Sequence, residues 1–231
     1  MKVCLIIPCF NEAKVVGTVI KEIKKTFDRT KYSFEIVVIN DGSKDNSSEV
    51  ARKAGATVID HLLNQGSGGA ILTGLAYARS NGFSYVITID ADGQHDPNDA
   101  LNCLEQAIKT KTDLLIGSRM INTDGMSKVK IFGNKGLSLI TRILFGVNVT
   151  DSQSGLRIFS QKALDGLTWK STGYESASEA IWRAKQAKLR ISESPIKAIY
   201  SDYSRAKGQN NWNAINILKS LVKQRLVELF E

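Results

Sequence analysis

The sequence is short of the residue types that build several common kinds of site. Its 231 residues include 3 cysteines, 3 prolines and 2 histidines. Three cysteines without metal-ligand spacing favour reduced, buried thiols over a disulfide framework or a zinc site. Two histidines give little basis for a serine–histidine–aspartate triad. No apolar run approaches the roughly 20 residues that cross a bilayer, and no signal-peptide pattern occurs at the start. We therefore expect a cytoplasmic protein.

Positive charge, in contrast, is in excess. The chain has 31 Lys and Arg against 23 Asp and Glu, a formal net charge of +8. This balance favours anionic partners such as nucleotides, phosphates or a membrane surface. We do not expect nucleic acid to be the partner, because the lysines are dispersed and no RNA-binding aromatic motif occurs.

Short apolar runs alternate with helical patterns in the first half of the chain. The runs that are typical of strands covered on both faces are 3–7, 34–39, 85–89 and 114–116. Helical spacing of apolar residues follows at 16–27, 71–78 and 97–110. The alternation predicts an α/β fold with a mostly parallel sheet and helices on both faces. We expect one domain over 1–231, with ligands bound at the carboxyl ends of the strands.

The second half is less regular. Amphipathic patterns predict helices at 131–147, 174–187 and 212–230, and partial alternation predicts a strand within 189–200. The last helix has an apolar stripe beside three cations, made of Ile215, Leu218, Val222, Leu226 and Leu229 next to Lys219, Lys223 and Arg225. Such a helix suits an anionic membrane surface, the core of its own chain, or a second copy of the chain in a homo-oligomer.

Three polar segments follow predicted strands: PCFNE at 8–12, NDGS at 40–43 and DADGQ at 90–94. The carboxyl ends of parallel strands meet at one edge of a sheet, so the three segments should line one crevice. The first two segments are also ordinary as a helix start and a turn. In the third, Asp90 and Asp92 project to the same side if the strand continues.

Two carboxylates side by side are costly unless a cation or hydrogen bonds offset their charges. The carboxylates of Asp90 and Asp92 and the amide oxygen of Gln94 are hard ligands that suit Mg²⁺ or Mn²⁺ carrying a diphosphate. An acidic turn that caps the helix at Pro97 is the alternative.

In this order along the chain, the three segments resemble the nucleotide-sugar-binding half of family 2 glycosyltransferases with the GT-A fold. The chain is more closely similar to the polyprenyl-phosphate glycosyltransferases of the dolichyl-phosphate mannose synthase type. Further matching segments are GSGGAILTG at 66–74, DLLIGSR at 113–119, DSQSGLR at 151–157 and ESPI at 193–196. The resemblance covers about residues 1–200. It implies a nucleotide-sugar-binding half at 1–118, an acceptor half at 119–210 and an amphipathic helix at 211–231.

The resemblance also implies roles for individual residues. Asp92 and Gln94, with Asp90, should hold the metal, and Asp92 is catalytic in this sense. The nucleotide should lie against Pro8, Phe10, Asn11, Glu12, Asp41, Gly69, Asp90, Ala91, Arg205 and Lys207. In the closing segment near the C-terminus, Asn211 occupies the position of the family's lysine, and Lys207 is the candidate substitute.

The acceptor is expected on the other side of the crevice. Arg119 should bind the acceptor phosphate, with Lys130 and Lys135 as further cations. A lipid phosphate is largely ionised near neutrality and needs no strong general base. A sugar hydroxyl would need a carboxylate base, for which Asp151 and Glu179 are the candidates.

We expect neither histidine to act directly in the reaction. We expect His61 at the surface. His95 should orient the metal-binding loop or cap the helix that follows it.

The sequence therefore predicts a metal-dependent, inverting hexosyltransferase. The donor is a nucleotide diphosphate sugar, with UDP-glucose or UDP-N-acetylglucosamine favoured over GDP-mannose. The acceptor is a polyprenyl phosphate, undecaprenyl phosphate in particular, in bacterial cell-wall or surface polysaccharide synthesis. The chain should be peripheral at the inner face of the membrane, held by anionic lipid or by a small membrane protein. A non-catalytic nucleotide-sugar sensor and a transferase acting on a sugar hydroxyl are the alternatives.

Overall fold

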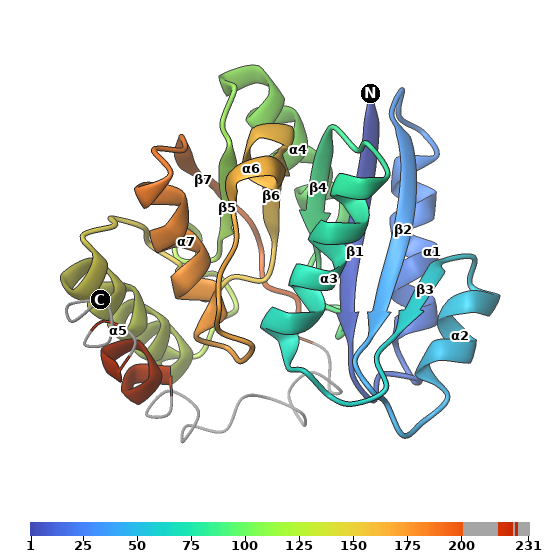
Figure 1. Cartoon of the computed structure of the whole chain (residues 1–231), viewed down its shortest axis with the longest axis horizontal. Helices are drawn as coiled ribbons and strands as arrows, with labels where there is room; N and C mark the ends of the chain where they lie inside the picture. Colours follow the sequence, from blue (N-terminus) through green and yellow to red (C-terminus); the bar gives the residue numbers. More distant parts are fainter. Residues whose placement is uncertain (201–216, 224, 226–231) are drawn as a thin grey trace.

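The computed structural model describes residues 1–200, 217–223 and 225. A 7-stranded sheet in the order β3-β2-β1-β4-β6-β5-β7 lies between two layers of helices (Figure 1). In chain order the elements are β1 (Lys2–Cys9), α1 (Val16–Phe27), β2 (Ser33–Asn40), α2 (Ser47–Lys53), β3 (Thr57–Asp60), α3 (Ser67–Ser80), β4 (Tyr85–Thr88), α4 (Pro97–Thr110), β5 (Leu114–Ser118), α5 (Lys128–Phe145), β6 (Arg157–Ser160), α6 (Gln161–Gly166), α7 (Ser176–Gln186) and β7 (Ile191–Pro195).

The sheet is mostly parallel, which confirms the predicted fold class. β1 pairs in parallel with β2 and β4, β2 with β3, and β5 with β7. β6 is the exception, because it runs antiparallel to both of its neighbours, β4 and β5. The sequence pattern does not predict β6, because its four residues, RIFS, include only two apolar side chains and make no apolar run.

The predicted helices of the first half form as their apolar spacing requires. α1 buries Val16, Val19, Ile20, Ile23 and Phe27 along one face. α4 begins at Pro97, whose fixed φ suits the first helical turn. The Asp96 side chain accepts a hydrogen bond from the backbone N–H of Asn98 at 2.8 Å and caps this helix. The prediction of a helix at 97–110 is confirmed.

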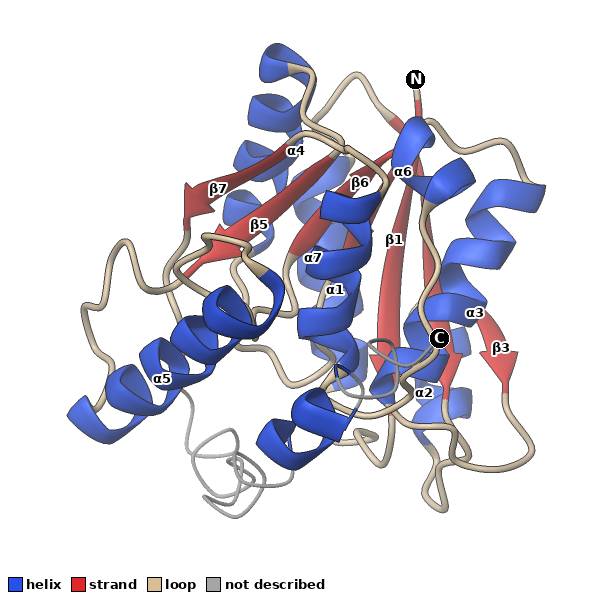
Figure 2. Cartoon of the chain, turned by 60° about the vertical axis from the view of Figure 1, so that its left-hand side comes forward, coloured by secondary structure: helices blue, strands red, loops and turns tan. Residues whose placement is uncertain are grey.

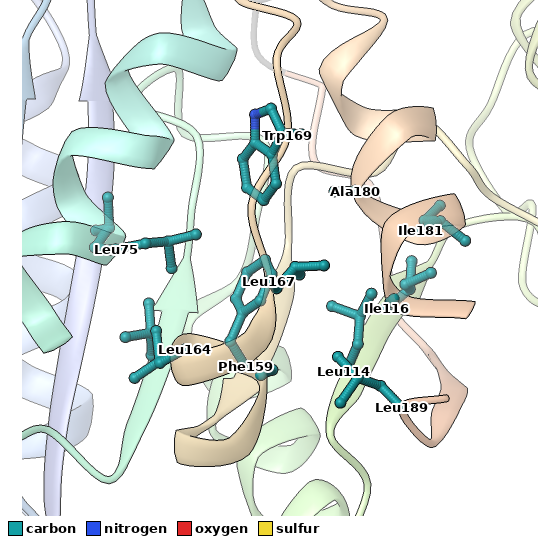
Figure 3. Packing of buried hydrophobic residues seen from close by; sticks show 14 of the residues in the cluster. Leu75, Leu114, Ile116, Phe159, Leu164, Leu167, Trp169, Ala180, Ile181 and Leu189 are labelled. Carbon is teal, nitrogen blue, oxygen red and sulfur yellow. The ribbon is translucent and has the colours of Figure 1, made fainter. Parts of the chain in front are cut away.

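Each face of the sheet has its own apolar core. α1, α2 and α4 pack on one face, and α3, α5, α6 and α7 contribute to the core on the other. Figure 3 shows the second core, where Leu75 of α3, Phe159 of β6 and Leu164 of α6 lie together. Leu114 and Ile116 of β5 pack toward Ile181 of α7 in the same cluster. Packing on both faces holds the strands in place, and with them the strand ends where the cavity described below lies.

The C-terminal helix is described over residues 217–223 and at residue 225. Ile217 and Leu221 are buried in the core. Of the predicted apolar stripe, Leu218 is half-buried and Val222 is exposed, so the stripe is not the buried side of the helix in this part. Ile215, Leu226 and Leu229 of that stripe lie outside the described residues. Among the helices that the structure describes, none combines the length and the apolar character that a bilayer-spanning helix needs.

Candidate active site

A cavity of about 580 Å³ opens at the carboxyl ends of β1, β2 and β4. Its walls also include residues of α3, α5 and α7. The predicted site residues that line it are Pro8, Phe10, Glu12, Asp41, Asp90, Ala91, Asp92, Gln94, Arg119 and Lys130. The fold therefore brings together residues from both halves of the sequence at one place.

Asp90 and Asp92 belong to one wall of this cavity. Nε2 of His95 lies 3.0 Å from Oδ2 of Asp90, and the His95 side chain is buried. Oδ1 of Asp92 accepts the backbone N–H of Gln94 at 3.0 Å, and its Oδ2 accepts the side-chain amide of Gln94. Every member of the DADGQ segment with a polar side chain thus has a fixed partner, and His95 orients this loop as expected.

The two carboxyl groups respond differently to the same surroundings. Burial acts to raise the pKa of Asp90, but the hydrogen bond with His95 and the charges of Arg119 and Arg157 outweigh it and hold the pKa below its ordinary value. Burial and the negative charge of Asp90 raise the pKa of Asp92. The charged form of Asp90 is thus stabilised by its surroundings. The charged form of Asp92 is disfavoured unless a cation lies nearby.

This donor set fits a hard divalent cation. The oxygens of Asp90, Asp92 and Gln94 are ligands of the kind that Mg²⁺ and Mn²⁺ take. Within the described ranges, no three His, Cys, Asp or Glu side chains gather as a potential metal cage. Two carboxylates plus substrate phosphate oxygens are the usual holder of Mg²⁺ in nucleotide sites, so this small protein contribution is sufficient.

Gly155 provides the space for the Asp90 carboxylate. A Cβ atom at position 155 would collide with both carboxylate oxygens of Asp90. The carbonyl of Gly155 also accepts a hydrogen bond from Oγ1 of Thr88 at 2.7 Å, at the end of β4. The SG pair of the DSQSGLR segment is therefore packed directly against the acidic wall.

Asp41 is the centre of the second polar cluster. Its carboxylate accepts the backbone N–H groups of Gln65 and Gly66, both at 2.8 Å. Nδ1 of His61 lies 2.7 Å from Oδ1 of Asp41, and Nε2 of His61 lies 2.9 Å from Oγ1 of Thr73. The prediction that His61 is a surface residue is wrong: its side chain is 13% exposed and links Asp41 to α3.

Two residues predicted to contact nucleotide do not line the cavity. The backbone of Asn11 is left-handed, with φ 56°, and its N–H donates to Oγ of Ser43 at 2.9 Å. Oδ1 of Asn11 accepts the backbone N–H of Lys44 at 2.8 Å, so this residue joins the loops after β1 and β2. Gly69 lies within α3, and its carbonyl accepts the Thr73 hydroxyl.

Arg119 is held on the cavity wall by Asp151. Nε of Arg119 donates to Oδ2 of Asp151 at 2.7 Å, and Nη2 donates to Oδ1 at 2.9 Å, which makes the pair bidentate. Asp151 is fully buried, and its backbone N–H donates to Oε1 of Glu193 at 3.2 Å. Glu193 also accepts the backbone N–H of Thr150 at 2.9 Å.

Glu179, like Asp151, is a buried carboxylate that binds groups of the protein. Its buried carboxylate accepts the backbone N–H groups of Lys170 at 3.1 Å and Ser171 at 2.8 Å. The carbonyl of the next residue, Thr172, accepts the N–H of Gly68 at the start of α3. Asp151 and Glu179 therefore do not face the cavity as the prediction of a general base requires. They position Arg119 and the turn around Thr172 instead.

The structure adds two cavity residues to which the sequence analysis gave no role. Arg157 lines the cavity and donates to the carbonyls of Ser152, Ser154 and Ala177. Burial lowers its pKa to about 10, against the opposing charges of Asp151 and Asp90. The sequence contains an indication of this position, because Arg157 is the last residue of the DSQSGLR segment that resembles the family.

Tyr200 also lines the cavity. The Lys130 ammonium lies 4.2 Å from the centre of its ring, which connects α5 to the chain after β7. Lys135 is exposed and does not line the cavity, contrary to its predicted phosphate role. Arg205 and Lys207 lie outside the described residues.

The sheet and its helices have the GT-A fold of glycosyltransferases. A solved structure with this fold is glucosyl-3-phosphoglycerate synthase from Mycobacterium tuberculosis, in complex with Mn²⁺, uridine diphosphate and glucosyl-3-phosphoglycerate. Its TM-score is 0.73 at 18% identity, over 98% of this chain and 79% of that chain. At this identity the likeness shows the fold alone.

Sequence comparison shows the family. Residues 4–168 match the model of Glycosyl transferase family 2, and the chain belongs to that family. It is 36% identical to the UDP-N-acetylglucosamine–dolichyl-phosphate N-acetylglucosaminyltransferase of Methanococcus voltae, over 98% of this chain and 97% of that protein. It is 28% identical to the undecaprenyl-phosphate mannosyltransferase of Micrococcus luteus, over 90% of this chain and 87% of that protein. The protein is thus an enzyme that transfers a glycosyl group from a nucleotide sugar.

Proposed function

We propose that this enzyme transfers a sugar from a nucleoside diphosphate to a polyprenyl phosphate, with inversion and with a divalent metal. The observation that carries the proposal is that carboxylates and cations line the same cavity. Asp90 and Asp92 belong to an acidic wall, whereas Arg119, Lys130 and Arg157 supply cations. An acidic wall suits a metal-bound diphosphate, and cations suit a second phosphate.

The donor would lie against the acidic wall. Asp90, Asp92 and Gln94 are the residues to hold Mg²⁺ or Mn²⁺, and a bound cation would supply the positive charge that a departing diphosphate requires. Phe10, Glu12 and Asp41 are the proposed contacts of the nucleoside, and their position in the lining of the same cavity supports this role. We infer UDP-N-acetylglucosamine as the donor, because the relative from Methanococcus voltae uses it and matches nearly the full chain.

A phosphate acceptor agrees better with the site than a sugar hydroxyl. A hydroxyl nucleophile needs a base within hydrogen-bond reach, and the two candidate carboxylates, Asp151 and Glu179, bind other protein groups. A phosphate monoester is largely ionised at neutral pH and needs only to be positioned. Arg119 can do this, because Asp151 fixes its guanidinium on the cavity wall.

The acceptor lipid can be narrowed by the relatives. The protein from Methanococcus voltae acts on dolichyl phosphate, and the protein from Micrococcus luteus acts on undecaprenyl phosphate. We propose dolichyl phosphate as the first acceptor to test, since that relative has the higher identity. Undecaprenyl phosphate, in a bacterial surface-polysaccharide pathway, is the second.

A direct assay tests this function. The full chain is incubated with radiolabelled UDP-N-acetylglucosamine, UDP-glucose or GDP-mannose, each with dolichyl or undecaprenyl phosphate, in Mg²⁺ or Mn²⁺. We expect label in the lipid extract with UDP-N-acetylglucosamine, loss of that label in excess chelator, and recovery when metal is restored. Nucleotide-sugar binding without any product would instead support a sensor. If no lipid is labelled, but label is transferred to a sugar supplied in place of the lipid, the acceptor is a hydroxyl.

A further inference from the structure

α5 has apolar side chains on two opposite sides. One side faces the body of the protein and contains the buried residues Leu137, Ser138, Thr141 and Phe145. The other side is exposed: Phe132 is 82% exposed, Leu139 55% and Ile143 72%. At about 100° per residue, these three exposed residues fall within an arc of about 40°, opposite the buried set. A helix that is apolar on both sides normally has both sides covered.

The orientation of α5 is fixed by contacts on its buried side. Oγ1 of Thr141 lies 3.0 Å from Oγ of Ser178 in α7. The hydroxyl of Ser138 donates to the carbonyl of Thr150 at 3.0 Å. The Phe145 ring stacks on Trp182, with centroids 4.7 Å apart. The exposed apolar side therefore cannot turn inward without breaking these contacts.

Cations border the exposed apolar side. Lys128, Lys135 and Arg142 are all exposed, and their helical positions place them along one flank of the Phe132–Leu139–Ile143 arc. The sequence of α5, KVKIFGNKGLSLITRILF, contains no acidic residue. An apolar strip with cations beside it matches the chemistry of an interfacial helix on anionic lipid.

A third part of α5 lines the cavity. Val129, Lys130, Gly133 and Asn134 all contribute to its wall. An acceptor with its phosphate beside Lys130 would therefore send its hydrocarbon chain out past α5. Figure 2 shows α5 at the outside of the molecule, and its outer side chains are exposed.

We propose that the outer surface of α5, defined by Phe132, Leu139 and Ile143 and bordered by Lys128, Lys135 and Arg142, docks on an anionic lipid bilayer. The cavity then opens at the membrane surface, where a polyprenyl phosphate presents its head group. This inference rests on the proposed lipid acceptor and assigns the surface by which the enzyme reaches it.

Cosedimentation of the full chain with protein-free vesicles of phosphatidylglycerol and phosphatidylcholine tests the docking. The vesicles contain no polyprenyl phosphate, so binding through the active site does not contribute. We expect wild type to bind at low salt, and the variant Phe132→Gln/Leu139→Gln/Ile143→Gln to bind at least tenfold more weakly. Lys128→Glu/Arg142→Glu should weaken binding and reduce its dependence on salt.

The matched control changes two other exposed leucines. Leu62 is 99% exposed and Leu63 74% exposed, in the loop after β3. Leu62→Gln/Leu63→Gln should bind vesicles as wild type does. If this control loses binding and the α5 variant keeps it, the docking surface has been assigned to the wrong place. Failure of wild type to bind protein-free vesicles also overturns the proposal and points to a membrane protein as the partner.

Activity assays separate this inference from the proposed function. With a short-chain polyprenyl phosphate dissolved in detergent, the α5 variant should retain wild-type transfer. With the acceptor embedded in vesicles, its transfer should fall at least tenfold. Equal transfer to the embedded acceptor by both proteins would contradict docking by α5. Vesicle binding that depends on α5, without sugar transfer to any lipid, would contradict the proposed function and leave the docking intact.

Discussion

The acidic wall and the cationic wall of the cavity are built in different ways. The acidic wall is local: Asp90, Asp92 and their partners Gln94 and His95 lie within six consecutive residues. The cationic wall is assembled over long distances, because Arg119 depends on Asp151, and Asp151 is held by Glu193. The difference teaches that a short motif is enough to build the acidic wall, whereas the cationic wall depends on the completed sheet.

Asp92→Asn should have the largest effect, because it removes a charge from the local wall. We expect transfer to fall by about 10³-fold, as for the loss of a group that stabilises a developing charge. Steady-state assay of lipid-linked product measures this. The control is Asp96→Asn, since Asp96 caps α4 and asparagine also caps helices well. If Asp92→Asn transfers sugar at the wild-type rate, the acidic wall does not serve the reaction.

Glu193→Gln tests whether the long-range wall acts through position. Glu193 accepts the N–H groups of Thr150 and Asp151, and a hydrogen bond to a charged group contributes about 1.5 kcal/mol or more. We expect the KM for the acceptor to rise about tenfold, while calorimetric affinity for the nucleotide sugar stays unchanged. Glu105→Gln on the exposed side of α4 is the control. Equal losses in acceptor and donor affinity would show that the two walls are not independent.

His61→Phe should have a smaller effect, on the donor side. The change keeps an aromatic ring but removes both nitrogen contacts, to Asp41 and to Thr73. Asp41 keeps the N–H groups of Gln65 and Gly66, so we expect nucleotide affinity to fall only about fivefold, or about 1 kcal/mol. Titration calorimetry with the nucleotide measures it. Thr73→Ser preserves the hydroxyl and should bind as wild type does; unchanged affinity in His61→Phe would remove His61 from the donor site.

The last prediction concerns stability above neutral pH and expects no change in activity. Burial raises the pKa of Cys4 to about 12 and that of Cys103 to about 11, from 9.0. Between about pH 9 and 11, unfolded chains lose these protons and folded chains keep them, so the free energy of unfolding should fall as pH rises.

Denaturant titrations at several pH values measure this fall. Cys103→Ala should show a shallower decline, by at most about 1.4 kcal/mol per pH unit. Its activity at neutral pH should be unchanged. A decline of the same steepness in wild type and in this variant would show that Cys103 does not contribute to it.

Much of the donor side could be predicted from the sequence. β1, β2 and β4 are continuous apolar runs, and the polar segments at their ends are contiguous, so their convergence follows from a parallel sheet. Asp90, Asp92 and Gln94 could be found in this way. His61 could not, because one polar residue after a strand gives no sign of its partners.

The acceptor side could be predicted only in part. Arg119 and Lys130 were found through the family resemblance, and both line the cavity. The pairing of Arg119 with Asp151 was not found, since it joins residues far apart in the chain and depends on β5, β6 and β7 lying side by side. The sequence predicts Asp151 as a candidate base for a hydroxyl acceptor, because an acidic residue in a motif shows its charge but not its burial.

The order of strands also affects how the chain is made. Both neighbours of β5, the strands β6 and β7, are encoded after it. A ribosome that adds about 5–20 residues per second needs several seconds to pass from Ser118 to Arg157. During that interval the LLIGS segment has two unpaired edges, which is the condition for wrong pairing between nascent chains. Yield on rapid overexpression should therefore depend on how quickly β6 follows β5 out of the ribosome.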